Sequence, residues 1–155
     1  MSRYAKGAKV AEERFASGVH GCSAVINQVG PAQLDFRGNG VTVSVGQRRL
    51  IHLQVPTPAV VRNKRATLER VHYLFKAEGG AQLQAVDVFD GLKQLLHVDG
   101  LTIEGDHSRD IDDDNSHRFP RPLPQVFWGV GISLLVRPPG SFFIAAAGAE
   151  FLVEA

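Results

Sequence analysis

The last thirty residues contain the feature that most constrains the fold, two long apolar runs joined by a turn. In the first run, residues 126–136, every even position holds a large apolar side chain, whereas the odd positions include two glycines and a serine. A period of two with one apolar face is typical of a strand in a sheet. The Pro-Pro-Gly sequence at 138–140 predicts a tight turn, because proline presets φ and glycine accepts a positive φ. We therefore expect a hairpin over 126–153 whose first strand turns Trp128 toward the core.

Shorter runs upstream show the same alternation. Large apolar residues occupy alternate positions in 41–45, 49–55 and 70–77. Turn signals stand between such runs, among them Gly-Asn-Gly at 38–40 and Gly-Gly at 79–80. The chain lacks the regular alternation of helical and strand segments that a parallel α/β fold requires. The sequence therefore predicts an all-β fold, an antiparallel β-sandwich that is jelly-roll-like.

The N-terminal segment differs in composition from the rest. Residues 3–16 are rich in Ala, Lys, Glu and Arg, which favour a helix, although Gly7 interrupts them and the apolar stripe is poor. We expect a short N-terminal arm or helix over 1–21. The remaining residues, 22–155, are enough for a single β-sandwich domain with one core.

Cysteine content and hydropathy bear on the compartment. One cysteine, Cys22, excludes a framework of disulfides within the chain and favours a reducing, cytoplasmic location. Residues 1–21 lack the order of a signal peptide. No stretch of eighteen apolar residues occurs, so we expect no membrane span.

Charge is divided unevenly along the chain. Residues 1–77 hold twelve Lys and Arg against four Asp and Glu, and residues 78–155 hold five against twelve. Such asymmetry can steer the association of oppositely charged faces. The sequence pI is near 8.0 and aromatic residues are sparse around the basic positions, so we expect no nucleic-acid partner.

The densest polar segment is 105–117, with five aspartates and two histidines. Its alternate aspartates resemble the first ligands of a calcium loop, but the position of the closing glutamate is Arg121, which excludes an EF-hand. Two interpretations remain, a calcium or polar-ligand site and a solvated loop whose Asp and Asn side chains cap turns. The predicted ligand-binding residues are Asp106, His107, Asp110, Asp112, Asp114 and His117. A bound calcium, the one cofactor considered, would use Asp110, Asp112 and Asp114.

Catalysis is not expected from the sequence. Cys22 lies in no known nucleophile motif, and the neighbours His107 and Ser108 point apart on an extended chain. A small hydrolase stays an alternative only because carboxylates are abundant.

The second C-terminal run, 142–153, has no face that suits water, because both alternating faces are apolar or small. Such a strand must be covered on both sides, by another part of the chain or by another subunit. We therefore predict a homo-oligomer. Its interface would comprise Phe127, Leu135, Phe143, Ala145, Ala147 and Phe151.

Four segments carry a resemblance to known proteins. They are Val86-Asp87-Val88-Phe89-Asp90-Gly91, Asp99-Gly100-Leu101, Gly105-Asp106-His107-Ser108, and residues 127–133 together with Arg137. In these segments the chain resembles a family of small bacterial β-sandwich proteins of unknown function. The resemblance implies a bacterial β-sandwich and assigns no catalytic residues.

Two functions follow from these observations. The first is a non-enzymatic, self-associating β-sandwich that acts as a structural or binding module. The alternative is a lectin-like, calcium-assisted protein that binds a carbohydrate or other ligand through the 104–117 loop.

Overall fold

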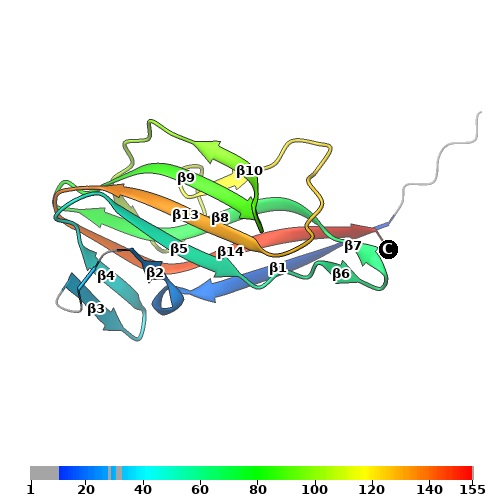
Figure 1. Ribbon diagram of the computed structural model, residues 1–155, viewed down its shortest axis with the longest axis horizontal. Helices are drawn as coiled ribbons and strands as arrows, with labels where there is room; N and C mark the ends of the chain where they lie inside the picture. The colour runs from blue at the N-terminus through cyan, green and yellow to red at the C-terminus, as the bar shows by residue number, and fades with distance from the viewer. Residues whose placement is uncertain (1–10, 28, 31–32, 155) are drawn as a thin grey trace, which may run out of the picture.

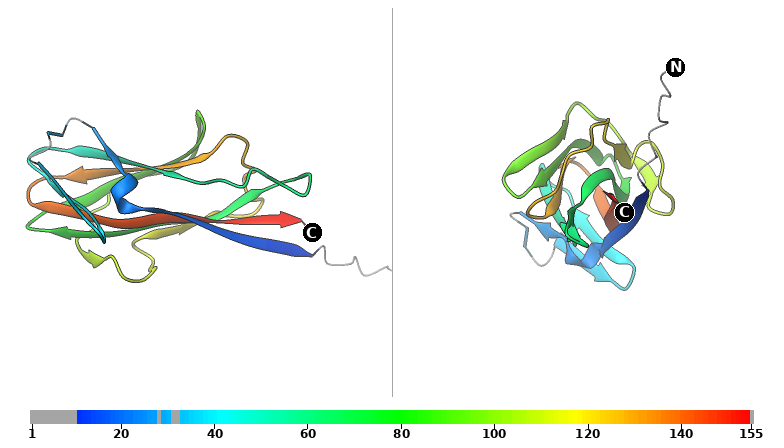
Figure 2. Two further views of the ribbon diagram at one scale, coloured as in Figure 1. Left: turned by 90° about the horizontal axis from the view of Figure 1, so that it is seen from below. Right: turned by 90° about the vertical axis from the view of Figure 1, so that its right-hand side faces the viewer.

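The protein is a sandwich of two antiparallel β-sheets, shown in Figure 1. The structure, a computed structural model, describes residues 11–27, 29–30 and 33–154. Figure 2 shows the elongated sandwich from the side and from one end. The prediction of an all-β, antiparallel sandwich is confirmed.

Sheet A is organised around its longest strand, β14. β8 pairs with one side of β14, while β4 and β1 share the other side at its two ends. The strands of sheet A are β1 (Glu12–His20), β3 (Leu34–Arg37), β4 (Gly40–Ser44), β8 (Thr67–Glu78), β11 (Gly105–His107), β12 (Ser116–Arg118) and β14 (Ser141–Glu154).

Sheet B covers the opposite side of the core. Its strands, in spatial order, are β10 (Lys93–Val98), β9 (Gln82–Asp90), β13 (Val130–Arg137), β5 (Arg49–Val55) and β2 (Val25–Ile26). A 3-10 turn η1 (Gly21–Ser23) and a small hairpin of β6 (Val60–Val61) and β7 (Lys64–Arg65) complete the described elements. The chain repeatedly crosses between the sheets, as from β4 to β5, from β8 to β9 and from β13 to β14. This alternation makes the topology jelly-roll-like.

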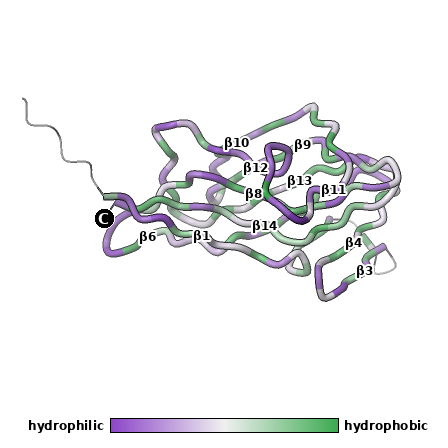
Figure 3. Tube along the Cα trace, turned by 180° about the vertical axis from the view of Figure 1, so that it is seen from behind, coloured by the Kyte–Doolittle hydropathy of each residue, from purple (hydrophilic) through white to green (hydrophobic). Residues whose placement is uncertain are grey.

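The core fills the space between the sheets. Phe75 and Phe142 of sheet A stack with ring centroids 5.1 Å apart. Ile51, Leu53 and Ile132 face them from sheet B and are fully buried. Figure 3 shows that polar residues gather instead in loops such as the one between β11 and β12.

The N-terminal segment forms a strand where a helix was predicted. β1 pairs with β14 in continuous antiparallel register, from Glu12 opposite Glu154 to His20 opposite Ala146. Without β1, this side of β14 would be an unpaired edge, and pairing satisfies its backbone groups. The helix prediction is therefore wrong for 12–16, while 3–10 lie outside the described residues. Residues 12–20 are therefore part of sheet A, although the sequence predicts an arm or helix there.

The first strand of the C-terminal hairpin is shorter than predicted. Val130, Ile132, Leu134 and Val136 are buried as expected, but β13 begins only at Val130. The side chain of Trp128 is 83% exposed, so the prediction that it faces the core is wrong. The strand phase is lost before Val130, where the backbone turns away from the ladder.

A bulge in β14 explains why its two faces both look apolar in sequence. The register against β8 shifts between Ile144 and Ala146, so the core face passes from even to odd positions. Ala147 and Phe151 consequently lie in the core, which corrects their assignment to a subunit interface.

The chain itself covers part of the outer face of β14. The His72 ring lies so close over Gly148 that a Cβ at that glycine would come within 2.5 Å of it. Neither the bulge nor this cover is visible in the sequence, and together they remove the main reason to expect self-association.

The other four predicted interface residues do not share one surface. Leu135 lies on the outer face of sheet B, whereas Phe143 and Ala145 lie on the outer face of sheet A. Phe127 is 46% exposed in the segment before β13, where the Arg65 guanidinium lies 4.4 Å from its ring centroid. A single flat interface cannot contain all four.

The turn between β13 and β14 tests the fold. Gly140 has φ +101°, and a Cβ there would lie 2.1 Å from the carbonyl oxygen of Glu78. We expect Gly140→Ala to lower the free energy of unfolding by about 2 kcal/mol or more. Gly46→Ala is the matched control, because Gly46 has no positive φ and a Cβ there meets nothing within 4 Å. Urea unfolding checks both variants, and equal stabilities would contradict the assigned turn.

Candidate functional site

The acidic loop between β11 and β12 is organised by hydrogen bonds among its own groups. Asn115 is fully buried, and its Nδ2 donates to the carbonyl oxygens of His107 (3.0 Å) and Asp110 (2.8 Å). Its Oδ1 accepts from the backbone N–H of Asp112 at 2.7 Å. Asp112 Oδ1 in turn accepts from the backbone N–H groups of Asp114 and Asn115. Side chains capping turns thus account for much of the polar sequence.

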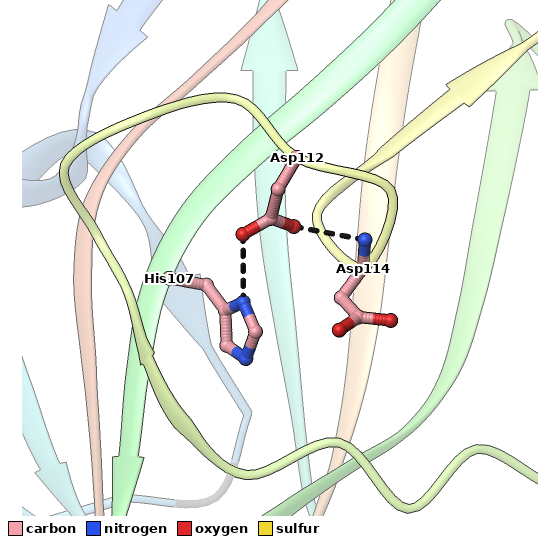
Figure 4. Close-up of side chains that lie close together, drawn as sticks. All are labelled: His107, Asp112 and Asp114. Carbon is pink, nitrogen blue, oxygen red and sulfur yellow. Dashed lines mark hydrogen bonds and ion pairs between the residues drawn. The ribbon is translucent and has the colours of Figure 1, made fainter.

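His107 lies between two acceptors, as Figure 4 shows for one of them. Its Nδ1 is 2.9 Å from Asp112 Oδ2 and its Nε2 is 3.1 Å from the carbonyl oxygen of Glu104. Both ring nitrogens must donate to satisfy these partners, which favours the imidazolium form. Burial alone would lower the pKa of His107, but the bonds to Asp112 and Glu104 outweigh it and raise that pKa above its usual value.

The structure brings together some of the predicted ligand residues. Ligand atoms of His107, Asp112 and Asp114 lie within 4.8 Å of one another, and Asp110 is not part of this group. Asp106 Oδ1 accepts from both the backbone N–H and the hydroxyl of Ser108. His117 is apart, because its Nε2 is 2.8 Å from the hydroxyl of the buried Tyr73.

Two of the three residues in that group already have partners in the loop. Asp112 uses both carboxylate oxygens and His107 uses both ring nitrogens within the chain. The calcium site through Asp110, Asp112 and Asp114 stays a prediction.

The charge on His107 can be measured directly. We expect its NMR titration to give a pKa above the usual histidine value, and Asp112→Asn to lower that pKa. Because the folded pKa is raised, the imidazolium stabilises the loop below the unfolded pKa, and this contribution is lost as the pH rises through the folded pKa. Asp113→Asn makes the same charge change but removes no hydrogen bond within the described residues, so it serves as the control. A pKa below the usual value would contradict the arrangement.

A second polar arrangement crosses the outer face of sheet B and was not predicted. We call it the polar row. It comprises Asn27, His52, Ser133, Asp87 and His97. Ser133 of β13 stands opposite His52 of β5 on one side and Asp87 of β9 on the other. His97 of β10 is the register partner of Asp87.

Hydrogen bonds hold the polar row in place and favour one tautomer of His52. Asn27 Nδ2 lies 3.1 Å from His52 Nε2 and can only donate, so Nε2 accepts and the ring proton is on Nδ1. Nδ1 lies 2.8 Å from Ser133 Oγ and therefore donates to it. With this placement of the Asn27 amide, His52 cannot take the hydroxyl proton of Ser133. Ser133 keeps that proton and can donate it outward, which suits binding rather than nucleophilic catalysis.

The far end of the polar row centres on a carboxylate. Asp87 Oδ1 is 2.5 Å from His97 Nδ1 and 2.7 Å from Gln94 Nε2. The hydrogen bond from His97 to Asp87, followed by the negative charge of Asp87, raises the pKa of His97. Acceptor and donor groups are thus fixed side by side on a rigid sheet.

A shallow depression of about 390 Å³ adjoins the polar row. His52 and Ser133 line one part of it, and Gln54 and Phe89 line another. Gly131, the register partner of Gln54 and Phe89, leaves the centre open, because a Cβ there would meet nothing within 4 Å. Gly129, Gly131 and Ser133, the small residues at the odd positions of 126–136, therefore all line the depression.

Trp128 stands next to this depression. A Cβ on Gly91, which lines the depression, would lie 3.0 Å from Trp128 Cδ1, so the indole covers that glycine. Gly129 has φ +153°, a conformation that L side chains rarely adopt, and it separates Trp128 from the start of β13 at Val130. The result is a large aromatic surface beside a polar hollow.

The carboxylate of Asp90 anchors this segment. It is 2% exposed and accepts from the backbone N–H groups of Phe127 (2.8 Å), Trp128 (2.8 Å) and Gly129 (3.0 Å). Burial raises the pKa of Asp90, but the three backbone hydrogen bonds outweigh burial and leave that pKa below its usual value. The exposed indole is therefore held on a backbone that has little freedom.

Sequence reasoning missed the polar row because its members come from separate elements. Alternation within one strand does not say which strands become neighbours. A local signal was present for Trp128, since a glycine follows it directly and Asp90-Gly91 ends another strand. Read together, these positions indicate a turn rather than the start of a buried strand.

The anchoring role of Asp90 can be tested with the single tryptophan of the chain as probe. We expect Asp90→Asn to destabilise the fold by about 2 kcal/mol, because a buried amide cannot accept all three backbone bonds. Fluorescence anisotropy should fall as Trp128 becomes mobile. The stabilisation by Asp90 should also be lost as the pH falls through its lowered pKa. Asp99→Asn, at an exposed turn, is the control, and an equally small effect of both variants would refute the anchor.

Comparisons with known proteins assign the chain to no family. No family model and no curated protein matches the chain. Among solved structures, TmCBM61 in complex with β-1,4-galactotriose is similar with a TM-score of 0.40 and 16% identity, over 92% of this chain and 88% of that one. A likeness at this level carries no argument about function. The resemblance to a family of small bacterial proteins stays a prediction.

The described residues contain no helix of the length and apolarity that a membrane span requires.

Proposed function

We propose that the protein is a carbohydrate-binding module that holds a neutral glycan on the outer face of sheet B. The observation that supports this most is the exposed indole of Trp128, fixed by Asp90 beside the depression and the polar row. Of the two functions that the sequence favoured, this is the ligand-binding alternative. The proposed site, however, is on sheet B and not in the acidic loop.

The chemistry of a sugar suits both parts of this site. A pyranose ring has a flat face of C–H groups that packs on the electron-rich face of an aromatic ring. Its hydroxyls need donors and acceptors placed at fixed positions around that face. Gln54, Ser133 and Asp87 offer an amide, a hydroxyl and a carboxylate within the same area of the sheet.

We propose that the site binds the glycan and does not cleave it. With the Asn27 amide donating to His52 Nε2, His52 Nδ1 donates to Ser133 and does not act as its general base. The carboxylate of Asp87 is engaged by His97 and Gln94, so it is already neutralised in part. These contacts support a site that recognises hydroxyl groups and releases its ligand unchanged.

Replacement of Trp128 tests the proposal. The probes are neutral di- to tetrasaccharides of galactose, glucose, mannose and xylose, measured by isothermal titration calorimetry. We expect at least one to bind, and Trp128→Ala to weaken it at least tenfold, about 1.4 kcal/mol, because the stacking surface is lost.

Phe36→Ala is the matched control, since Phe36 is also exposed but lies on β3 of sheet A. Gly131→Leu should fill the depression and weaken binding without touching Trp128. Binding that survives both Trp128→Ala and Gly131→Leu would exclude this face as the site.

A further inference from the structure

A second depression lies on the outer face of sheet A, on the opposite side of the sandwich from the polar row. We call it the sheet A pocket. Its volume is about 490 Å³, and strands β3, β4, β8, β11 and β14 all contribute to its lining. The lining residues that matter most here are Arg37, Asn39, Thr42, Lys76, Arg109 and Phe143.

An aromatic ring forms the apolar part of this pocket. Phe143 and Ala145, both on β14, line it. The Phe143 ring packs tightly against Gly40 of β4, where a Cβ would come within 2.8 Å of two ring carbons. That contact fixes the ring while the remainder of its surface borders the pocket.

Three cationic side chains, those of Arg37, Lys76 and Arg109, line the pocket together with the ring. Arg37 bonds Asp35 through Nε alone (3.0 and 3.1 Å), and its Nη1 and Nη2 make no hydrogen bond with the described residues. Lys76 Nζ makes one ion pair, 3.0 Å from Glu78 Oε1, which leaves two of its N–H groups free. The Arg109 side chain is 87% exposed.

The pocket lining contains two carboxylates, Asp106 and Glu78, against three cations. Asp106 Oδ1 accepts from the N–H and the hydroxyl of Ser108, and its Oδ2 is 3.9 Å from Arg109 Nε. Glu78 already pairs with Lys76. The pocket therefore offers a ligand more donors with positive charge than acceptors with negative charge, which favours an anion.

Neutral polar groups complete the lining. The side chains of Asn39, Thr42 and Ser141 border the pocket and make no hydrogen bond within the described part of the chain. A ligand that carries hydroxyls as well as a negative charge would use both kinds of group. A bare inorganic anion would leave the aromatic ring and these side chains unused.

We propose that the sheet A pocket binds an acidic sugar, a uronic acid residue of a glycan. Its carboxylate meets Arg37, Lys76 and Arg109, its hydroxyls meet Asn39 and the neighbouring hydroxyl side chains, and its ring lies on Phe143. The inference rests on contacts separate from those of Trp128, so it holds or fails independently of the neutral-glycan site.

NMR titration of the ¹⁵N-labelled protein tests the proposal, with sodium digalacturonate as the probe. We expect saturable shifts of the backbone amides of Thr42, Lys76 and Phe143. Lys76→Met keeps most of the apolar stem and should weaken binding about tenfold, the worth of about one charge-assisted hydrogen bond. Lys93→Met makes the same change on β10 of sheet B and should leave the affinity unchanged.

Other outcomes would overturn the proposal. Equal shifts with galactose would show that the charge is irrelevant, and equal shifts with sodium acetate would show that the sugar is. Equal weakening by Lys93→Met would show that only the net charge of the protein matters. The absence of any saturable shift would show that the pocket does not bind the probe. Arg109→Gln repeats the test if Lys76→Met fails to fold. Trp128→Ala should keep digalacturonate binding, which separates this inference from the neutral-glycan site.

Discussion

The pairing of β14 on both sides is the constraint on which the rest of the structure depends. A strand that has β8 on one side and β4 and β1 on the other has no free backbone edge in most of its length. Its bulge after Ile144 then lets one continuous strand supply core residues in two phases. Because β14 pairs along both sides at the centre of sheet A, the backbone of the sheet is fixed. The side chains on its outer face can therefore be polar without loss of the core.

Both proposed sites use this rigidity. A ligand that binds to paired strands orders no backbone, so the entropy cost of binding is confined to the side chains and the ligand. Trp128 is not on a strand, yet the carboxylate of Asp90 gives its backbone comparable order through three hydrogen bonds. The acidic loop achieves order differently, by using its own aspartates and Asn115 as internal caps, which leaves fewer groups for a ligand.

How much the sequence could predict follows from the range of each interaction. Alternation is local, so the strands of the sandwich and the buried face of Val130–Val136 were predictable. The bulge in β14 and the strand β1 depend on neighbours distant in sequence, and no periodicity encodes them. The exposure of Trp128 depends on Asp90, and its one local signal, the glycine that follows it, runs against the periodicity. For the same reason no pattern in the sequence points to the polar row. The acidic loop is contiguous and therefore visible in the sequence, but its polar groups are largely used in its own turns.

The register of β1 and β14 also decides how the domain would respond to force. Glu12 lies opposite Glu154, so the first described strand and the last run antiparallel with their outer ends side by side, as Figure 1 shows. Backbone hydrogen bonds between antiparallel strands lie perpendicular to the strands. A load that pulls these two ends apart therefore acts along the bonds and breaks them one pair after another, from Glu12 toward His20. Under tension β1 would therefore separate from β14 one residue pair at a time. A load along β13 would instead have to break its ladders with β5 and β9 at the same time.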